Sequence, residues 1–152
     1  MEARMKHPAM TVPGAMDAMQ ALSKAAAGTG VPFATLKMVE LRASQINGCS
    51  FCVEMHAREL RKAGESEERI GTVAAWREAP WFSDAERAAL ALTEAVTRLA
   101  DRPNPVTDDI WSEAARHYDE VELGGLLLAI GSINVWNRLN AAIHQPAGAF
   151  PA

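Results

Sequence analysis

The sequence contains few cysteines, few aromatic residues and no long hydrophobic run. Two cysteines among 152 residues are too few for a disulfide-stapled secreted scaffold. No apolar run approaches the roughly 20 residues that a membrane-spanning helix requires. The formal net charge of −4 gives no sign of a surface for nucleic acid or anionic lipid. The stretch MEARMKHPAMTVPG lacks the apolar centre of a signal peptide. We therefore expect a cytoplasmic protein without nucleic-acid or membrane partners.

The remaining composition predicts a single all-α domain. A hydrophobic fraction of 49% and a charged fraction of 22% are typical of a folded globular chain of this length. Alanine, the strongest helix former, is abundant, and no alternating apolar and polar run bounded by turn residues predicts a strand. We expect a bundle of six or seven helices within one domain over residues 1–152. Its parts are an irregular arm (1–14), a helical core (15–145) and a loose tail (146–152).

Capping and turn residues divide this core into helices. Asn47-Gly48 ends one helix, and Ser83 with Glu86 has the form of a capping box. Ser66 and Thr107 are typical N-cap residues of two further helices. The helices are predicted at about 15–27, 33–46, 49–64, 67–76, 83–100, 108–117 and 120–142. The last is mostly apolar, and we expect it to be buried.

The clearest functional signal is a group of two cysteines and a histidine on one helix face. Cys49 lies at the predicted helix N-terminus, where unpaired N–H groups and the helix dipole favour a thiolate. Cys52 follows one turn later, so the two sulfurs can close a short disulfide. His56 follows after a further turn, where its imidazole can reach the Cys52 sulfur as base or ion-pair partner. The pattern predicts a peroxidatic thiol, a resolving thiol and a proton acceptor.

A third group is expected to orient the imidazole of His56 or to pass its proton onward. Glu59 lies three residues later and can hydrogen-bond the far ring nitrogen. Glu40 lies on the preceding helix, which must fold back near the cysteines through a short turn. Solvent exposure is the alternative for either carboxylate, and Lys37 can pair with Glu40 at the i,i+3 spacing.

Two other interpretations of the cysteines stay open. Cys49, Cys52 and His56 could supply three zinc ligands, but a closed structural site needs a fourth. The other histidines are isolated in the sequence: His7, His117 and His144. The cysteines could also be inert residues that face a core. A thioredoxin-like site would require a βαβ context that is absent. We expect neither a metal nor a cofactor.

The stretch from Glu40 to His56, and above all its SQINGCxxCxxxH portion, resembles the core of the AhpD-like alkylhydroperoxidase family. This family is part of the carboxymuconolactone decarboxylase-like superfamily. The similarity continues over most of the chain beyond the arm, through Gly64, Ala75–Glu78, Glu86–Leu90 and Ile133–Arg138. The resemblance implies an all-helical fold that assembles into homotrimers or homohexamers. It also implies a CxxC pair that reduces organic hydroperoxides and is restored by an external dithiol, a lipoyl carrier protein in the case of AhpD.

The resemblance further implies the role of each residue. Cys52 attacks the peroxide, the more exposed Cys49 resolves the sulfenate into a disulfide, and His56 carries protons. The relay glutamate of AhpD corresponds here to Lys37, and we expect Glu40, one turn further on, to take its place.

Two other functions compete with peroxide reduction. A thiol-disulfide oxidoreductase or redox sensor would share every motif without turning over peroxide. A carboxymuconolactone-type decarboxylase stabilises an enolate, and this chemistry has no use for a vicinal dithiol.

Overall fold

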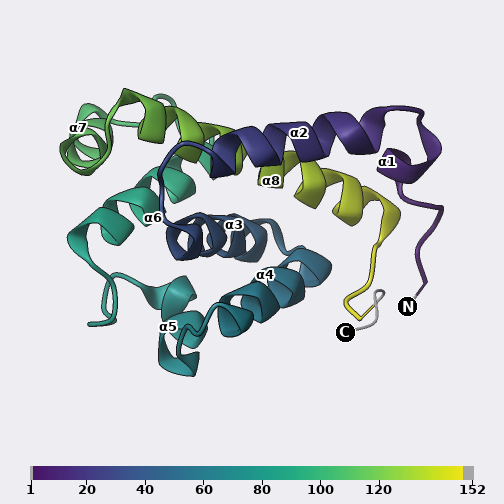
Figure 1. The fold of residues 1–152 in the computed structure, drawn as a ribbon, viewed down its shortest axis with the longest axis horizontal. Coiled ribbons are helices and arrows are strands. Elements are labelled where there is room, and N and C mark those ends of the chain that lie inside the picture. Colours follow the sequence, from purple (N-terminus) through teal and green to yellow (C-terminus); the bar gives the residue numbers. More distant parts are fainter. Residues whose placement is uncertain (1, 149–152) are drawn as a thin grey trace.

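The computed structural model describes residues 2–148, which form eight α-helices and one 3₁₀ turn and contain no strand (Figure 1). The expected all-α fold is confirmed, with one helix more than predicted. The helices are α1 (Pro8–Thr11), α2 (Ala15–Ala27), α3 (Phe33–Asn47), α4 (Ser50–Lys62), α5 (Glu67–Thr72), α6 (Asp84–Thr97), α7 (Asp108–His117) and α8 (Glu120–Ile143), with the 3₁₀ turn η1 at Val73–Ala75. Within this described part, none of the helices has the length and hydropathy needed to cross a bilayer.

Helix α3 lies in the middle of the molecule, between α2 and α8 on one side and α4 on the other (Figure 1). Leu36 and Val39 pack in one apolar cluster with residues of α2, α6, α7 and α8. Met38 and Leu41 pack in a second cluster with residues of α4, α5 and α6. Because both sides of α3 are buried, close packing fixes the positions of the side chains that it carries toward the other helices.

Of two predicted N-cap residues, Ser83 makes the expected side-chain hydrogen bonds and Thr107 does not. Ser83 and Glu86 form both hydrogen bonds of the capping box at the start of α6, as the sequence indicates. Thr107 precedes α7 but makes no side-chain cap hydrogen bond. The helix predicted over 83–100 ends already at Thr97, and the next residues are exposed. A further turn would gain no packing, which supplies most of the stability of a helix in a protein.

The helix predicted over 67–76 is shorter than the sequence indicates. It ends at Thr72 and continues only as the 3₁₀ turn. There the chain buries Val73 completely and brings the indole N–H of Trp76 to Glu94 Oε1 at 3.0 Å. This buried hydrogen bond and the burial of Val73 outweigh the local preference for a longer helix.

The two ends of the chain also differ from the expectation of an irregular arm and a loose tail. The arm, residues 1–14, contains α1, and residue 1 lies outside the described residues. Of the predicted tail, 146–152, residues 149–152 lie outside them too. The backbone N–H of Gly148 donates a hydrogen bond to Glu54 Oε2 at 2.6 Å, so this part of the tail contacts α4.

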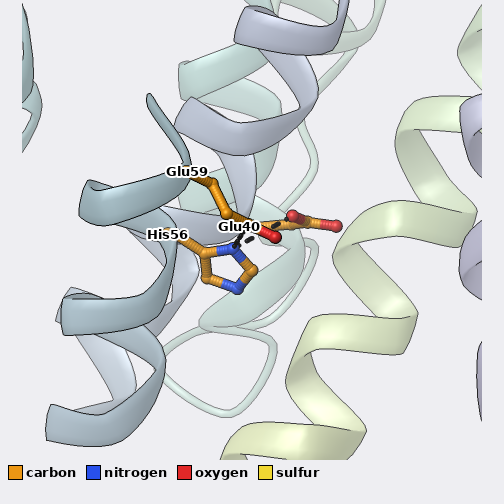
Figure 2. A group of neighbouring side chains, drawn as sticks. All are labelled: Glu40, His56 and Glu59. Carbon is orange, nitrogen blue, oxygen red and sulfur yellow. Dashed lines mark hydrogen bonds and ion pairs between the residues drawn. The ribbon is translucent and has the colours of Figure 1, made fainter. Parts of the chain in front are cut away.

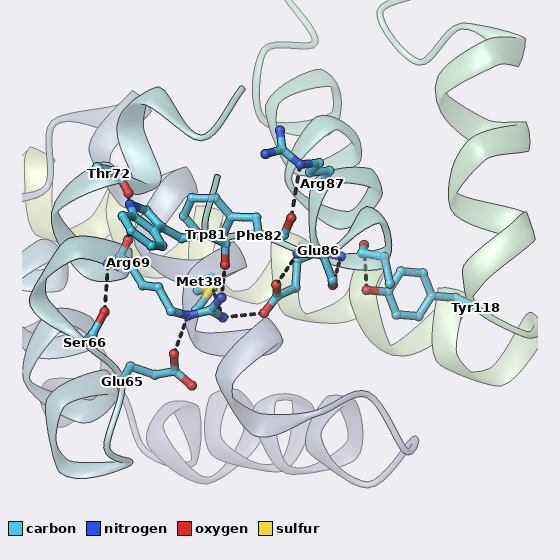
Figure 3. Close-up of polar contacts among 12 residues, drawn as sticks. Met38, Glu65, Ser66, Arg69, Thr72, Trp81, Phe82, Glu86, Arg87 and Tyr118 are labelled. Carbon is cyan, nitrogen blue, oxygen red and sulfur yellow. Dashed lines mark hydrogen bonds and ion pairs between the residues drawn. The ribbon is translucent and has the colours of Figure 1, made fainter. Parts of the chain in front are cut away.

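Two arginines fix the irregular segment between η1 and α6 (Figure 3). The guanidinium of Arg69 pairs with Glu86 Oε1 at 2.6 Å and donates to the carbonyl oxygen of Trp81. Arg87 donates to the carbonyl oxygen of Trp76 at 3.1 Å. These bonds satisfy carbonyl groups that have no partner in regular secondary structure, and they hold the segment against α6.

A glycine of α8 allows the segment that follows α2 to approach this helix closely. A Cβ atom on Gly125 of α8 would lie 2.8 Å from Cβ and 2.9 Å from Cγ2 of Thr29. The hydroxyl of Thr29 is bonded to the carbonyl oxygen of Ala26 at 2.9 Å, which holds this side chain in place. The contact therefore tolerates no side chain at position 125.

Substitution of Gly125 by alanine is predicted to destabilise the protein by overpacking, by about 1–3 kcal/mol in the free energy of unfolding. Gly131 of the same helix is the matched control, because a Cβ atom there meets nothing within 4 Å. Gly131→Ala should raise the free energy of unfolding by roughly 0.5–1 kcal/mol. Urea unfolding followed by circular dichroism measures the free energy of unfolding of both variants. Equal effects of the two substitutions would show that the contact with Thr29 is unimportant.

Candidate functional site

A sharp turn places the two cysteines at the start of α4. Gly48 ends α3 in the left-handed conformation, with φ of +67°, which glycine adopts without steric cost. Cys49 follows as the N-cap of α4, and its Sγ accepts a hydrogen bond from the backbone N–H of Cys52 at 3.3 Å. The Cα atoms of the two cysteines are 5.4 Å apart, and the sulfurs are joined in a disulfide. The structure thus shows the oxidised form of the pair.

A cavity of about 530 Å³ opens onto Cys52 and His56. Its apolar lining consists of Met16, Phe51, Met55, Ile133 and Trp136. The resemblance implied that Cys49 is the more exposed cysteine; 4% of Cys49 and 1% of Cys52 are accessible, so both are buried and the difference between them is small. Cys52, and not Cys49, lines the cavity. A small molecule in the cavity would therefore meet Cys52 first.

Two carboxylates hold the buried imidazole of His56 (Figure 2). Nδ1 lies 2.9 Å from Glu59 Oε2 and 3.3 Å from Glu40 Oε2. Carboxylates on Nδ1 favour the ring form with the proton on that nitrogen, which leaves the lone pair of Nε2 free. Nε2 is buried and has no hydrogen-bond partner. His56 therefore presents a base beside the cavity that Cys52 lines.

Lys37 supplies the positive charge of this cluster. Its Nζ lies 2.7 Å from Glu40 Oε2 and 3.4 Å from Glu59 Oε2. Burial lowers the pKa of Lys37, but the charges of the two carboxylates outweigh burial and raise it. Burial likewise raises the pKa of Glu59, and the contacts with His56 and Lys37 outweigh it and lower the pKa. Two carboxylates against one ammonium leave one negative charge, which a proton on His56 would neutralise.

Glu40, His56 and Glu59 are also residue types that bind metal ions. Each offers one ligand atom, and these three atoms lie within 4.8 Å of one another. The ammonium of Lys37 contacts the same two carboxylate oxygens that face His56. Lys37 therefore already supplies a cation that balances one of the two carboxylates. The zinc site considered from the sequence requires two thiolates, whereas these cysteines are joined to each other.

Asn140 of α8 is a site residue that the sequence analysis missed. Its buried side chain donates from Nδ2 to Cys52 Sγ at 3.2 Å, and Nδ2 lies 3.7 Å from Cys49 Sγ. It follows Asn134 and Asn137 at three-residue spacing on a mostly apolar helix. This row of asparagines was the sequence signal that could have identified Asn140 as a site residue. The other two asparagines hold the turn before the cysteines, since Asn47 Nδ2 donates to both of their side-chain oxygens.

The structure thus brings all four predicted site residues into one place. Cys49, Cys52 and His56 lie along the first two turns of α4, and Glu40 reaches His56 from α3. Sequence reasoning left open whether Glu40 or Glu59 contacts the imidazole, and both do.

Glu59→Gln is predicted to destabilise the protein in a pH-dependent way. Because the pKa of Glu59 is lowered from 4.5 in the folded state, its charge stabilises the fold above pH 4.5. This stabilisation is lost as the pH falls through the lowered value. We expect a lower urea midpoint than wild type at pH 7 and a difference that shrinks below pH 4.5. Glu68→Gln, an exposed position on α5, is the control. A difference that does not change with pH would contradict the charge interaction.

Comparisons with known proteins agree with this architecture. The model of the carboxymuconolactone decarboxylase family matches residues 13–95. YdfG, an uncharacterised protein of Bacillus subtilis, is 36% identical over 135 residues, which cover 89% of this chain and 90% of YdfG. YnjA of Escherichia coli, also uncharacterised, is 34% identical over 110 residues, which are 72% of this chain and 59% of YnjA.

Solved structures show the same fold. One is a protein of unknown function from Agrobacterium tumefaciens, named as a candidate AhpD antioxidant defence protein. It has a TM-score of 0.89 and 34% identity, covering 98% of this chain and 100% of that one. A cysteine-to-alanine variant of the debrominase Bmp8, in complex with 2,3,4-tribromopyrrole, has a TM-score of 0.81 at 20% identity, covering 92% of this chain and 74% of that one. The chain belongs to the carboxymuconolactone decarboxylase family, as an AhpD-like member.

Proposed function

We propose that the protein is a thiol-dependent alkyl hydroperoxide reductase. The observation that carries the proposal is that Cys52 and His56 line the same cavity, and that the buried Nε2 of His56 has no hydrogen-bond partner. Cys52 lies in the first turn of α4, where the helix dipole favours a thiolate. A reactive sulfur and a base beside one cavity are the two groups that peroxide reduction by a thiol requires.

The first step is attack of the Cys52 thiolate on the distal oxygen of the hydroperoxide. His56 Nε2 takes the proton of the Cys52 thiol beforehand. An S–O bond forms and the O–O bond breaks, so Cys52 becomes a sulfenic acid. The alkoxide leaves and takes the proton back from His56 as an alcohol. Glu40 and Glu59 stabilise the imidazolium between the two proton transfers.

The second step joins the two cysteines. Cys49 attacks the Cys52 sulfur, an S–S bond forms and the S–O bond breaks, and hydroxide leaves with the Cys49 proton as water. The product is the disulfide that the structure contains. An external dithiol then reduces it by thiol-disulfide exchange. Because both sulfurs are buried, the reductant must be slender, and a lipoyl group fits this requirement.

Burial of the sulfurs also favours peroxide reduction over the competing redox function. A protein thiol-disulfide oxidoreductase has to present a sulfur to the disulfide of another protein. Here 4% of Cys49 and 1% of Cys52 are accessible, and Cys52 is reached through a cavity of about 530 Å³. Such a cavity has the size of a small-molecule site. Decarboxylation of a lactone is disfavoured because a disulfide stands at this cavity.

The proposal includes a homo-oligomer in the cytoplasm, where reducing conditions allow the dithiol to be restored. Val121, Leu128 and Val135 are exposed at seven-residue spacing along α8. This spacing places them in one stripe on the helix surface, and such apolar stripes are typical of contacts between subunits. A trimer or hexamer stays a prediction.

Replacing Cys52 by serine should abolish turnover of cumene hydroperoxide with excess dithiothreitol as reductant. Cys49→Ser is the matched variant, because it keeps the attacking sulfur and removes the resolving one. It should accumulate a Cys52 sulfenic acid that dimedone labels, detected by mass spectrometry. Wild-type turnover by Cys52→Ser would refute the assignment. A wild-type protein that exchanges disulfides but consumes no peroxide would support the oxidoreductase alternative instead.

Glu40→Gln should slow peroxide turnover about tenfold or more. The variant replaces the carboxylate 3.3 Å from His56 Nδ1 by a neutral amide, so the imidazolium loses one of its two negatively charged partners. A loss of about 1.4 kcal/mol of transition-state stabilisation slows a reaction tenfold. Lys37→Gln combined with Glu40→Gln restores one net negative charge beside His56. If charge balance is what matters, the double variant should recover part of the lost kcat/KM. Equal losses in the single and double variants would contradict the charge argument.

A further inference from the structure

The sulfur of Cys52 lies in a mostly apolar part of the protein. The buried cluster around it contains Ala43 and Ile133, with Phe51 and Trp136 packed against it. Only 1% of Cys52 is accessible. Burial of this kind disfavours a thiolate, because little water remains to solvate its charge. A reactive thiolate at Cys52 therefore requires a polar group of the protein that stabilises the charge.

The imidazole of His56 lines the same cavity but is not bonded to this sulfur. Within residues 2–148, the buried Nε2 of His56 has no hydrogen-bond partner. Nδ1 faces Glu59 at 2.9 Å and Glu40 at 3.3 Å (Figure 2). In the proposed reaction His56 accepts the thiol proton, and the structure shows no contact through which it also holds the sulfur.

Asn140 of α8 contacts the sulfur directly. Its Nδ2 donates to Cys52 Sγ at 3.2 Å and lies 3.7 Å from Cys49 Sγ. Asn140 is itself buried and lines the cavity beside Cys52. An amide N–H binds a thiolate more strongly than the disulfide sulfur that it contacts here, because the acceptor is then charged. The donor is therefore in place before the charge forms.

The two sulfurs have donors of different origin. Cys49 Sγ, at the N-cap of α4, accepts the backbone N–H of Cys52 at 3.3 Å. Cys52 lies three residues further along, and its sulfur accepts from the side chain of Asn140. The start of α4 thus supplies the donor for Cys49, and α8 supplies the donor for Cys52. Loss of the side-chain amide should affect Cys52 and spare Cys49.

Two other asparagines of α8 hold the chain that leads into the cysteines. Asn47 Nδ2 donates to Oδ1 of Asn134 at 3.0 Å and to Oδ1 of Asn137 at 2.9 Å. Asn137 Nδ2 donates to Ser44 Oγ at 3.1 Å. These bonds fasten the connection between α3 and α4 to α8. They therefore keep the amide donor of α8 and the acceptor sulfur of α4 at a fixed separation.

We propose that Asn140 is a catalytic residue that stabilises the Cys52 thiolate by donating a hydrogen bond from Nδ2 to its sulfur. When the thiol ionises, the S–H bond breaks and its proton goes to His56 Nε2. The electron pair stays on the sulfur beside the amide. The inference rests on the proposed function only in taking Cys52 as the reacting sulfur.

The test measures the Cys52 thiolate directly. In a Cys49→Ser background, Cys52 is the one remaining thiol, and the rate of its alkylation by iodoacetamide is followed against pH. Asn140→Leu keeps a side chain of similar size and removes the donor. It should move the midpoint of this profile upward by about one pH unit, which is a tenfold loss of thiolate below the midpoint.

Asn140→Asp separates the charge interaction from packing. It keeps the shape of the side chain and replaces the donor by a second negative charge, so it should move the midpoint further than Asn140→Leu does. A role in packing alone gives the opposite order, because aspartate has the shape of asparagine. That order, or an unchanged midpoint in both variants, would overturn the proposal.

The other sulfur supplies the matched control. In a Cys52→Ser background the remaining thiol is Cys49, which has its own backbone donor. Asn140→Leu should shift the midpoint of Cys49 much less than that of Cys52. Equal shifts of the two midpoints would show that the substitution loosens the whole site, and they would contradict a specific bond to Cys52.

A further measurement keeps Asn140 in place and so does not depend on the folding of an Asn140 variant. In the Cys49→Ser protein, the side-chain amide protons of Asn140 are followed by NMR as the pH rises. They should shift with the midpoint of the alkylation profile. The amide protons of Asn137, which bonds Ser44 instead, should shift much less.

An Asn140 amide that does not respond to ionisation of Cys52 would overturn the proposal. Alkylation and NMR report the thiolate whatever the natural oxidant is. A failure of peroxide reduction would therefore leave both results interpretable.

Discussion

The left-handed turn at Gly48 is the constraint on which the geometry of the site depends. It folds α4 back along α3, and this reversal brings Glu40 and Lys37 to the imidazole of His56. It also makes Cys49 the N-cap of α4, where its sulfur accepts the backbone N–H of Cys52. The asparagines of α8 hold the turn through Asn47. A longer or looser connection would separate Glu40 of α3 from the imidazole of His56 on α4.

The ion cluster around His56 suggests how an AhpD-like site works with Lys37 at the position of the relay glutamate. Glu40 presents its carboxylate one helical turn later, and Lys37 balances one of the two acidic charges. The same fold is found in a debrominase, so the fold alone does not define a reaction. The proposed peroxide reduction therefore depends on Cys52, His56 and the cavity that they share.

Local sequence signals predicted most of the fold and the two cysteines and the histidine of the site. Capping residues such as Ser83 gave helix ends, because a cap depends on neighbours within one turn. The spacing of Cys49, Cys52 and His56 was equally local. Asn140 was missed because it meets Cys52 across 88 positions of the chain, and only tertiary packing creates that contact. The contact of His7 with Trp136 has the same origin.

The position of Cys49 as the N-cap of α4 bears on the energy balance between the oxidised and reduced forms. Its sulfur accepts a backbone N–H, and a negatively charged acceptor would bind that donor more strongly than a disulfide sulfur does. Opening the disulfide therefore improves the electrostatics of the helix terminus. In disulfide-forming proteins, such stabilisation of the reduced state raises the reduction potential. The disulfide of the proposed redox pair would therefore accept electrons even from mild donors, and the pair would need no strongly reducing partner for its regeneration.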